Sequence, residues 1–236
     1  CSCCPLLTGI PPTLVNLRKL NCSCCRLIAE IPPELVNLKE LYCSKCPLIT
    51  EMPSTLVNLK GLYCSYCSLL TEMPSTLVNL KELYCFECPL ITGIPPELVS
   101  LRKLNCSCCP LLTGIPPTLV NLREFNCSYC PLLTGIPPTL VNLREFDCSY
   151  CPLIAIIPQG IARVLCYECS WIDHLQNTDF KSNLEKLITI QRNMETLIKY
   201  KRFKRIVYSE QFARLWYHPN AGGGRRAKRR ILEGLY

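Results

Sequence analysis

The sequence predicts an α/β solenoid, a fold in which one structural unit is repeated and stacked along an axis. A 21-residue unit recurs along the chain, clearest as LNCSCCPLLTGIPPTLVNLRE at 104–124 and FNCSYCPLLTGIPPTLVNLRE at 125–145. Self-similarity at a fixed period of roughly 20–50 residues is the sequence signature of a solenoid. Each copy also carries a Cys-x-x-Cys pair, and the first cysteine of each pair keeps the period: Cys1, Cys22, Cys43, Cys64, Cys85, Cys106, Cys127 and Cys148.

The unit resembles a leucine-rich repeat. Residues 17–27 read L-x-x-L-x-C-x-x-C-x-L, and the frame of that family is L-x-x-L-x-L-x-x-N/C-x-L. Cysteine therefore takes the third apolar position and also the Asn-or-Cys position. The resemblance covers residues 1–170, about eight copies of which the last is shortened. It implies short parallel strands on a concave face and a mostly irregular convex side.

A second resemblance joins the repeat to the end of the chain. The Cys-x-x-Cys-Pro-Leu unit, together with the ending LWYHPNAGGGRRAKRR, resembles cysteine-rich leucine-rich repeat proteins encoded by giant DNA viruses. This resemblance implies a viral protein that acts in the host cytoplasm.

Within each copy we expect a short strand, a turn at Cys-Pro, an extended stretch through Thr-Gly-Ile-Pro-Pro and a return along Leu-Val-Asn-Leu. Prolines stay out of the expected strands and fall on the return side, where no ladder donor is needed. Long helices are not expected in so short a unit. The core is expected to consist of the columns that contain Leu14, Leu17, Leu20, Leu27 and Ile31.

The 21 cysteines allow three interpretations. The pairs at Cys22 and Cys43 have a spacing that is familiar from zinc sites, but that spacing is also what the repeat period imposes. A disulfide framework is typical of short secreted chains that lack a core, and this chain has an odd number of cysteines. We favour a ladder of buried thiols, because free cysteine behaves as a small hydrophobe with a weak S–H donor. No metal or other cofactor is expected, and the setting is expected to be intracellular.

The repeats degrade after Cys151, and the last Cys-x-x-Cys pair, at Cys166, follows a shortened copy. Residues 171–236 are therefore expected to form a C-terminal cap and a basic helical extension. Terminal repeats of solenoids are commonly atypical in this way. From about Ser182 the apolar residues take helical spacing, and Glu185 completes a capping box with Ser182.

Charge divides the chain more sharply than hydropathy does. Residues 181–236 hold 14 Lys and Arg against 4 Asp and Glu, whereas residues 1–180 hold 12 against 14. The densest basic run follows Gly222-Gly223-Gly224 and consists of Arg225, Arg226, Lys228, Arg229 and Arg230. Such a run fits nucleic acid, an acidic protein, an import receptor that would direct the chain to the nucleus, or simply a solvated tail.

Three columns of residues are expected to be exposed on the concave face, and they vary most between copies. They contain Asn21, Ser23 and Cys24 in one copy and the equivalent residues in the others. Together they form an aromatic patch in the middle of the solenoid, made of Tyr42, Tyr63, Tyr66, Tyr84 and Phe86. Exposed tyrosines are common anchors of protein interfaces, although stacked rings can also serve only to stabilise neighbouring strands.

Catalysis finds little support, because both histidines lie outside the repeats and the thiols are expected to be interior. The sequence therefore predicts a non-catalytic module that binds a protein partner on the concave face, with no membrane partner. Two alternatives stay open: a nucleic-acid-associated protein that binds through its basic extension, and a substrate adaptor of a ubiquitin ligase.

Overall fold

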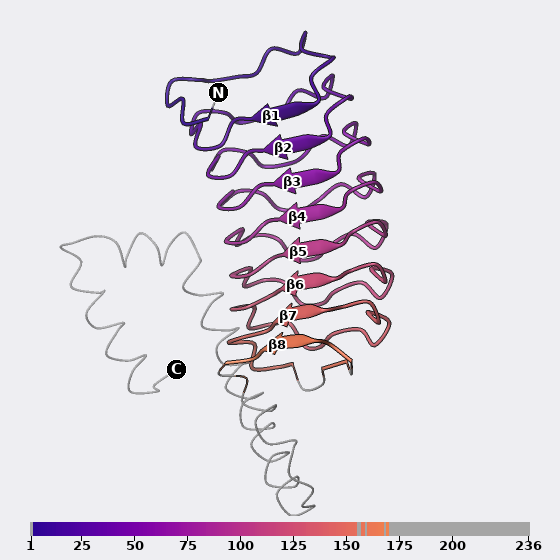
Figure 1. Ribbon diagram of the computed structural model, residues 1–236. Coiled ribbons are helices and arrows are strands. Elements are labelled where there is room, and N and C mark those ends of the chain that lie inside the picture. The colour runs from indigo at the N-terminus through magenta and orange to yellow at the C-terminus, as the bar shows by residue number, and fades with distance from the viewer. Residues whose placement is uncertain (1, 155–156, 159, 168, 170–236) are drawn as a thin grey trace, which may run out of the picture. The chain divides into compact units, whose positions relative to one another are not determined.

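Eight strands of three residues each form one parallel sheet, in the order in which they occur along the chain (Figure 1). The computed structural model describes residues 2–154, 157–158, 160–167 and 169, all within the first of two units of the chain, Cys1–Gln176. The strands are β1 (Lys19–Asn21), β2 (Glu40–Tyr42), β3 (Gly61–Tyr63), β4 (Glu82–Tyr84), β5 (Lys103–Asn105), β6 (Glu124–Asn126), β7 (Glu145–Asp147) and β8 (Arg163–Leu165).

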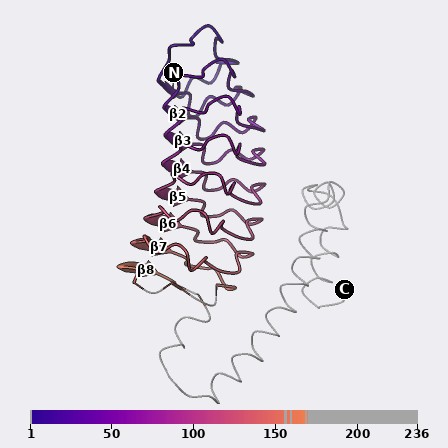
Figure 2. The ribbon, with the colours of Figure 1, turned by 90° about the vertical axis from the view of Figure 1, so that its right-hand side faces the viewer.

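The strands pair in register, so that equivalent residues of successive copies lie opposite each other. Leu20 pairs with Leu41, and Leu41 pairs with Leu62. The backbone ladder extends past the strand ends, since the N–H of Cys22 donates to the carbonyl of Tyr42 at 2.8 Å. Every position of the repeat therefore forms a column along the solenoid, and Figure 2 shows the strands along one side of the stacked coils.

Inward-facing residues recur every third position through the turns. The N–H of Cys25 donates to the carbonyl of Cys22 at 3.1 Å, and the N–H of Ile28 donates to that of Cys25 at 3.2 Å. Because each of these turns advances three residues, Ile28 faces the core and is 0% exposed, whereas Leu27 is 44% exposed. The expected core column at Leu27 is therefore wrong, and the column at Ile28 replaces it.

Leu14 also departs from the expectation, for a different reason. It lies in the first turn and is exposed, while its equivalents in later turns, such as Leu35, are buried. In this solenoid, each coil is covered by its neighbours, and no described coil precedes Leu14.

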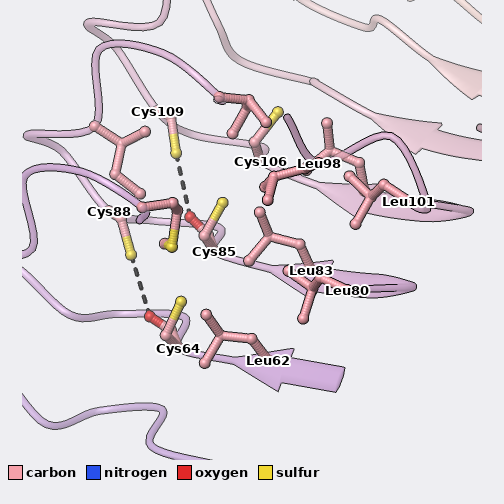
Figure 3. Packing of buried hydrophobic residues seen from close by; sticks show 14 of the residues in the cluster. Leu62, Cys64, Leu80, Leu83, Cys85, Cys88, Leu98, Leu101, Cys106 and Cys109 are labelled. Atoms are coloured by element: carbon pink, nitrogen blue, oxygen red, sulfur yellow. Dashed lines mark hydrogen bonds between the residues drawn. The ribbon is translucent and has the colours of Figure 1, made fainter. Parts of the chain in front are cut away.

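Both cysteine columns lie in the core, as predicted (Figure 3). The second cysteine of each turn donates its S–H to the backbone carbonyl of the first cysteine of the preceding turn. Cys88 bonds the carbonyl of Cys64 and Cys109 bonds that of Cys85, each with a sulfur-to-oxygen distance of 3.2 Å. The same contact recurs from Cys46 to Cys151. Each thiol thus satisfies a buried carbonyl and ties one coil to the next.

The thiols of the first column are held in the protonated state. The hydrogen bond with Cys67, together with burial, raises the pKa of Cys43 well above its usual value. Burial, together with the thiol of Cys130, does the same to the pKa of Cys106. A thiolate is disfavoured in such an environment because neither solvent nor a cation stabilises its charge.

A second polar ladder lies on the return side of each coil. The side-chain amide of Asn37 donates to the carbonyl of Val15 at 2.9 Å, and that of Asn58 donates to the carbonyl of Val36 at 3.0 Å. The contact recurs at Asn79, Asn121 and Asn142. Ser100 occupies the equivalent position in one copy, where the amide is missing.

No α-helix occurs in the part of the chain that the structure describes, so the solenoid there is a β-solenoid and not α/β. The return segment carries Ile-Pro-Pro or Met-Pro in most copies, and proline inside a helix removes a hydrogen bond and clashes with the preceding turn. None of the described residues forms a helix able to cross a bilayer. The expected cap and helical extension at 171–236 lie outside the described residues.

We predict that Ser100→Asn stabilises the protein. The new amide reaches the carbonyl of Val78 as its equivalents do in the neighbouring coils, and a net hydrogen bond contributes about 0.5–1.5 kcal/mol. Urea unfolding of the two proteins measures the difference. Asn121→Ser is the matched control and is expected to lose a similar amount. Equal stability of all three proteins would contradict the role assigned to this ladder.

We predict a steep loss of stability above about pH 8.5, where thiols of an unfolded chain ionise. The pKa of each buried thiol in the first column is raised by folding, so its contribution is complete below that pH and is lost as the pH rises. The bonds with Cys43 and Cys85 lower the pKa of the partner thiols Cys67 and Cys109, whose contribution is complete above that pH and does not offset the loss there. Each such thiol removes about 1.4 kcal/mol per pH unit. Urea unfolding at pH 7 to 10.5 under reducing conditions measures the slope.

The control for this experiment is Cys106→Ala. This variant is less stable at every pH, but its slope above pH 9 is expected to be shallower by one thiol. A free energy of unfolding that stays constant from pH 8 to 10.5 would show that the thiols are not buried as described.

Candidate interaction surface

The strand face, which consists of the outward side chains of β1–β8, is the face that the sequence predicts as the binding surface. In a strand, successive side chains point to opposite faces. The middle residue of β1 to β7 is buried in the core, and the two flanking residues point outward. Two columns of side chains therefore cover this face, one before and one after the buried residue.

The structure brings the five predicted aromatic residues into two clusters. Tyr42 and Tyr63 stack with ring centroids 4.3 Å apart and an angle of 2° between the rings. Tyr84 continues the stack, 5.1 Å from Tyr63. Tyr66 and Phe86 form a separate edge-to-face pair with centroids 5.1 Å apart. The three stacked rings are half-buried, and Tyr66 is 38% exposed.

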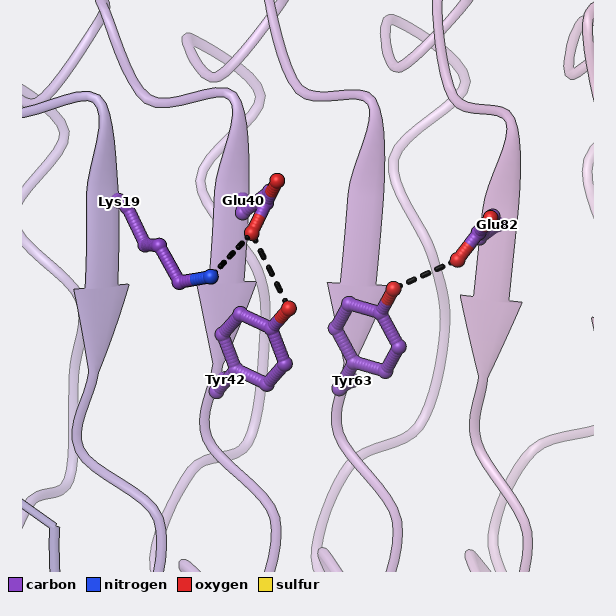
Figure 4. Close-up of polar contacts among 5 residues, drawn as sticks. All are labelled: Lys19, Glu40, Tyr42, Tyr63 and Glu82. Carbon is purple, nitrogen blue, oxygen red and sulfur yellow. Dashed lines mark hydrogen bonds and ion pairs between the residues drawn. The ribbon is translucent and has the colours of Figure 1, made fainter.

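Hydrogen bonds fix two of the three stacked rings (Figure 4). The hydroxyl of Tyr63 donates to Glu82 Oε2 at 2.6 Å, and that of Tyr42 donates to Glu40 Oε2 at 3.1 Å. Glu40 also pairs with Lys19 Nζ at 2.8 Å, and this ammonium lies 4.9 Å from the centroid of the Tyr42 ring. Burial and the bond to Glu82 raise the pKa of Tyr63, so its hydroxyl remains a donor at neutral pH.

Gly61 makes room for the centre of this stack. Its equivalents in the other copies are charged residues. A Cβ atom at Gly61 would lie 3.1 Å from Cε2 of Tyr63 and 3.4 Å from its hydroxyl oxygen. The ring of Tyr63 therefore lies over Gly61, and this explains why the one uncharged residue of the column stands beside the middle tyrosine.

The sequence reasoning missed the column that precedes the buried residue, although the same strand alternation predicts it. Lys103 in this column pairs with Glu124 at 2.9 Å, and Arg163 pairs with Glu145 at 3.9 Å. The column therefore adds charges of both signs to the strand face: Lys19, Glu40, Gly61, Glu82, Lys103, Glu124, Glu145 and Arg163.

A groove on the strand face begins at Tyr84 and runs across β5 to β8. Most of its outward residues are polar or charged, the buried Leu104, Phe125 and Phe146 form its floor, and Asn126 donates its side-chain amide to Asp147 Oδ2 at 3.3 Å. The outward residues that line it are Tyr84, Lys103, Asn105, Glu124, Asn126, Glu145, Asp147, Arg163 and Leu165. The strand face thus changes along the solenoid from an aromatic half to a polar half.

The third predicted column follows the strands and has left-handed backbone conformation throughout. Its φ angles lie between 55° and 64°, a region of backbone conformation that residues other than glycine and asparagine rarely adopt. Tyr129 and Tyr150 in this column stack with centroids 4.3 Å apart. The sequence does not reveal this conformation, because the positions hold Cys, Lys, Tyr and Glu in place of glycine.

The geometry of the described residues adds no candidate metal site. In the ranges that the structure describes, no three His, Cys, Asp or Glu side chains are grouped so that they could hold a metal ion. Both histidines lie outside those ranges, and so does the basic patch Arg225, Arg226, Lys228, Arg229 and Arg230.

Four segments match the family model described as Leucine Rich Repeat: residues 16–38, 37–59, 100–122 and 121–143. These four segments are leucine-rich repeats. The matches fall in both halves of the sheet and share the register in which the strands pair. No curated protein matches the chain, so the resemblance to proteins of giant DNA viruses stays a prediction.

Solved structures with leucine-rich repeats are similar to this solenoid. The functional domain of InlJ from Listeria monocytogenes, which includes a cysteine ladder, is 26% identical with a TM-score of 0.58; the match covers 69% of this chain and 42% of that one. The leucine-rich repeat domain of the type III effector XopL is 19% identical with a TM-score of 0.52, over 69% of this chain and 73% of that one. The second likeness shows the fold alone.

We predict that Ser65→Ala stabilises the protein by about 1 kcal/mol. Ser65 is 1% exposed, and its hydroxyl has no hydrogen-bond partner among the described residues. In two copies the equivalent hydroxyl bonds an asparagine, as Ser128 does with Asn126 at 2.8 Å, but Tyr63 takes the place of that asparagine. Ser44, which also follows a tyrosine, donates to the carbonyl of Tyr63 at 3.2 Å, a contact that Ser65 does not repeat. An unsatisfied buried hydroxyl costs about 1–3 kcal/mol. Thermal or urea unfolding measures the change.

Ser128→Ala is the matched control and is expected to destabilise, because it removes the bond to Asn126. If Ser65→Ala were as destabilising as Ser128→Ala, the hydroxyl of Ser65 would have a partner in solution.

Proposed function

We propose that the solenoid is a non-catalytic interaction module that holds a protein partner on its strand face. The centre of that surface would be Tyr42, Tyr63, Tyr66, Tyr84 and Phe86. The observation that carries the proposal is the order of these rings in the unbound chain: all five are stacked or paired and partly exposed, and the hydroxyls of Tyr42 and Tyr63 are fixed by hydrogen bonds to Glu40 and Glu82.

Such order favours binding for an energetic reason. Immobilising a side chain on association costs about 0.5–1.5 kcal/mol, and rings that are already fixed avoid much of that cost. Tyrosine also offers a large apolar surface with a polar end, which is why it is frequent among the residues that dominate interface energies. The acidic and basic residues of the preceding column would form the polar rim.

The likeness to leucine-rich repeat proteins supports the same proposal, because leucine-rich repeat domains bind protein partners. All four segments that match the family model lie in the solenoid. The setting we propose is intracellular, where thiols remain reduced. A substrate adaptor of a ubiquitin ligase would be one form of this function.

The second candidate is association with nucleic acid through the basic extension. It is favoured by the charge of residues 181–236, which hold 14 basic and 4 acidic side chains. Because phosphate contacts release counterions, binding of that kind weakens steeply with salt. Salt and nuclease therefore separate the two candidates.

We predict that the variant Tyr42→Ala/Tyr63→Ala/Tyr84→Ala loses its protein partner. Affinity capture from a cell lysate with nuclease present, at low and at raised salt, compares it with the unchanged chain. Loss of three interface tyrosines is expected to weaken binding by at least about a hundredfold, since each hot spot contributes 2 kcal/mol or more. The variant with three Tyr→Phe changes keeps the stack and is expected to retain most of the binding.

Tyr129→Ala/Tyr150→Ala is the matched control, because it removes another stacked pair at the edge of the strand face. Far-UV circular dichroism establishes that all variants are folded. Capture of the same partner by the triple alanine variant would contradict the proposal, and so would complete loss of captured protein on nuclease treatment.

A further inference from the structure

A row of seven basic residues runs along the solenoid at the position just before each strand. We call this row the basic ladder. Its members are exposed, and every copy from β1 to β7 supplies one: Arg18, Lys39, Lys60, Lys81, Arg102, Arg123 and Arg144. Residues 1–180 contain nearly equal numbers of basic and acidic residues, so their composition does not reveal this row.

The backbone holds the basic ladder straight and evenly spaced. The N–H of Lys39 donates to the carbonyl of Arg18 at 2.7 Å, and the N–H of Lys60 donates to that of Lys39 at 2.7 Å. The same bond continues to Arg144 at 2.7–2.8 Å. Neighbouring strands lie about 4.8 Å apart, so the seven residues span a row of roughly 29 Å with one positive charge in each coil.

No acidic side chain among the described residues neutralises the basic ladder. The three ion pairs found there involve Lys19, Lys103 and Arg163, none of which belongs to the ladder. The acids that they engage, Glu40, Glu124 and Glu145, stand in the adjacent column. Like charges at the spacing of the coils repel each other by about 1 kcal/mol in water. An anion from outside the solenoid would relieve that repulsion along the whole row.

We propose that the basic ladder binds the phosphate backbone of a single-stranded nucleic acid that lies along the solenoid axis. A polynucleotide carries one charge per nucleotide whatever its sequence, and this regularity matches a row with one cation per coil. The ladder residues do not line the groove on the strand face, so they offer charge without a shaped pocket. Phosphate contacts of this kind position a strand but do not select its bases.

A duplex fits this row less well than a single strand does. Each strand of a duplex winds around the helix axis, so its phosphates approach a straight row only where the strand crosses that row. A flexible single strand can follow all seven residues. The two forms are therefore expected to differ in the number of phosphates contacted, and that number sets the salt dependence of binding.

We test the proposal in the full chain with the basic patch neutralised: Arg225→Gln, Arg226→Gln, Lys228→Gln, Arg229→Gln and Arg230→Gln. Fluorescence anisotropy measures binding of a labelled 20-nucleotide oligothymidylate between 50 and 300 mM KCl. Seven phosphate contacts give a slope of log K against log salt of about −5 for a single strand. A 20-base-pair duplex is expected to show a shallower slope.

The ladder variant adds Lys60→Gln, Lys81→Gln, Arg102→Gln and Arg123→Gln to that background. Its slope is expected to shrink to about −2, because three contacts remain. The matched control carries Lys19→Gln, Arg26→Gln, Lys45→Gln and Lys103→Gln, which remove the same charge from positions outside the ladder, and it is expected to keep most of the slope. Circular dichroism verifies that both are folded.

Three results would overturn the proposal. The first is failure of the neutralised chain to bind the oligonucleotide at 50 mM KCl. The second is an equal loss in the ladder variant and the control, which would show dependence on net charge alone. The third is displacement of the oligonucleotide by poly-glutamate at equal charge concentration, which would assign the row to an acidic protein.

Discussion

Stacking of each coil in register on the next is the constraint on which the rest of the structure depends. A three-residue strand has no independent stability, and its backbone groups are satisfied only by the coils on either side. The thiol and asparagine ladders extend the same dependence to the turns and the return segment, as Cys88 and Asn58 show. Each coil therefore stabilises its neighbours, and no coil is a separate unit.

Register also turns a single position of the repeat into a surface. A tyrosine after the buried leucine becomes a stack across β2, β3 and β4, and a basic residue before each strand becomes a row along the axis. These columns lie at different positions of the coil, so a partner on the tyrosines and a polyanion on the ladder need not compete. Neutral composition of the solenoid is compatible with both, because the basic ladder is a column without acidic residues.

The sequence predicts the period, the strands and both cysteine columns, since alternation around Leu20 and Cys22 places those residues. It does not predict that Ile28 faces the core in place of Leu27, because the family frame counts two residues after Cys25 where the turns advance three. The column of Lys19 and Glu40 was accessible from the same alternation and was missed. The stacking of Tyr63 depends on side-chain orientation and on space above Gly61, which only coordinates reveal.

Deletion of one complete coil tests the register most directly. Removal of residues 106–126 takes out 21 residues and joins Asn105 to Cys127, so every column stays in line. The account predicts a folded chain that unfolds cooperatively in urea with a slightly smaller m-value, because less surface is buried. Removal of residues 107–126, which takes out 20, leaves one coil with an extra residue and is predicted to give a less stable chain than the first deletion, because that residue interrupts the columns at the junction. Equal behaviour of the two deletions would contradict the account.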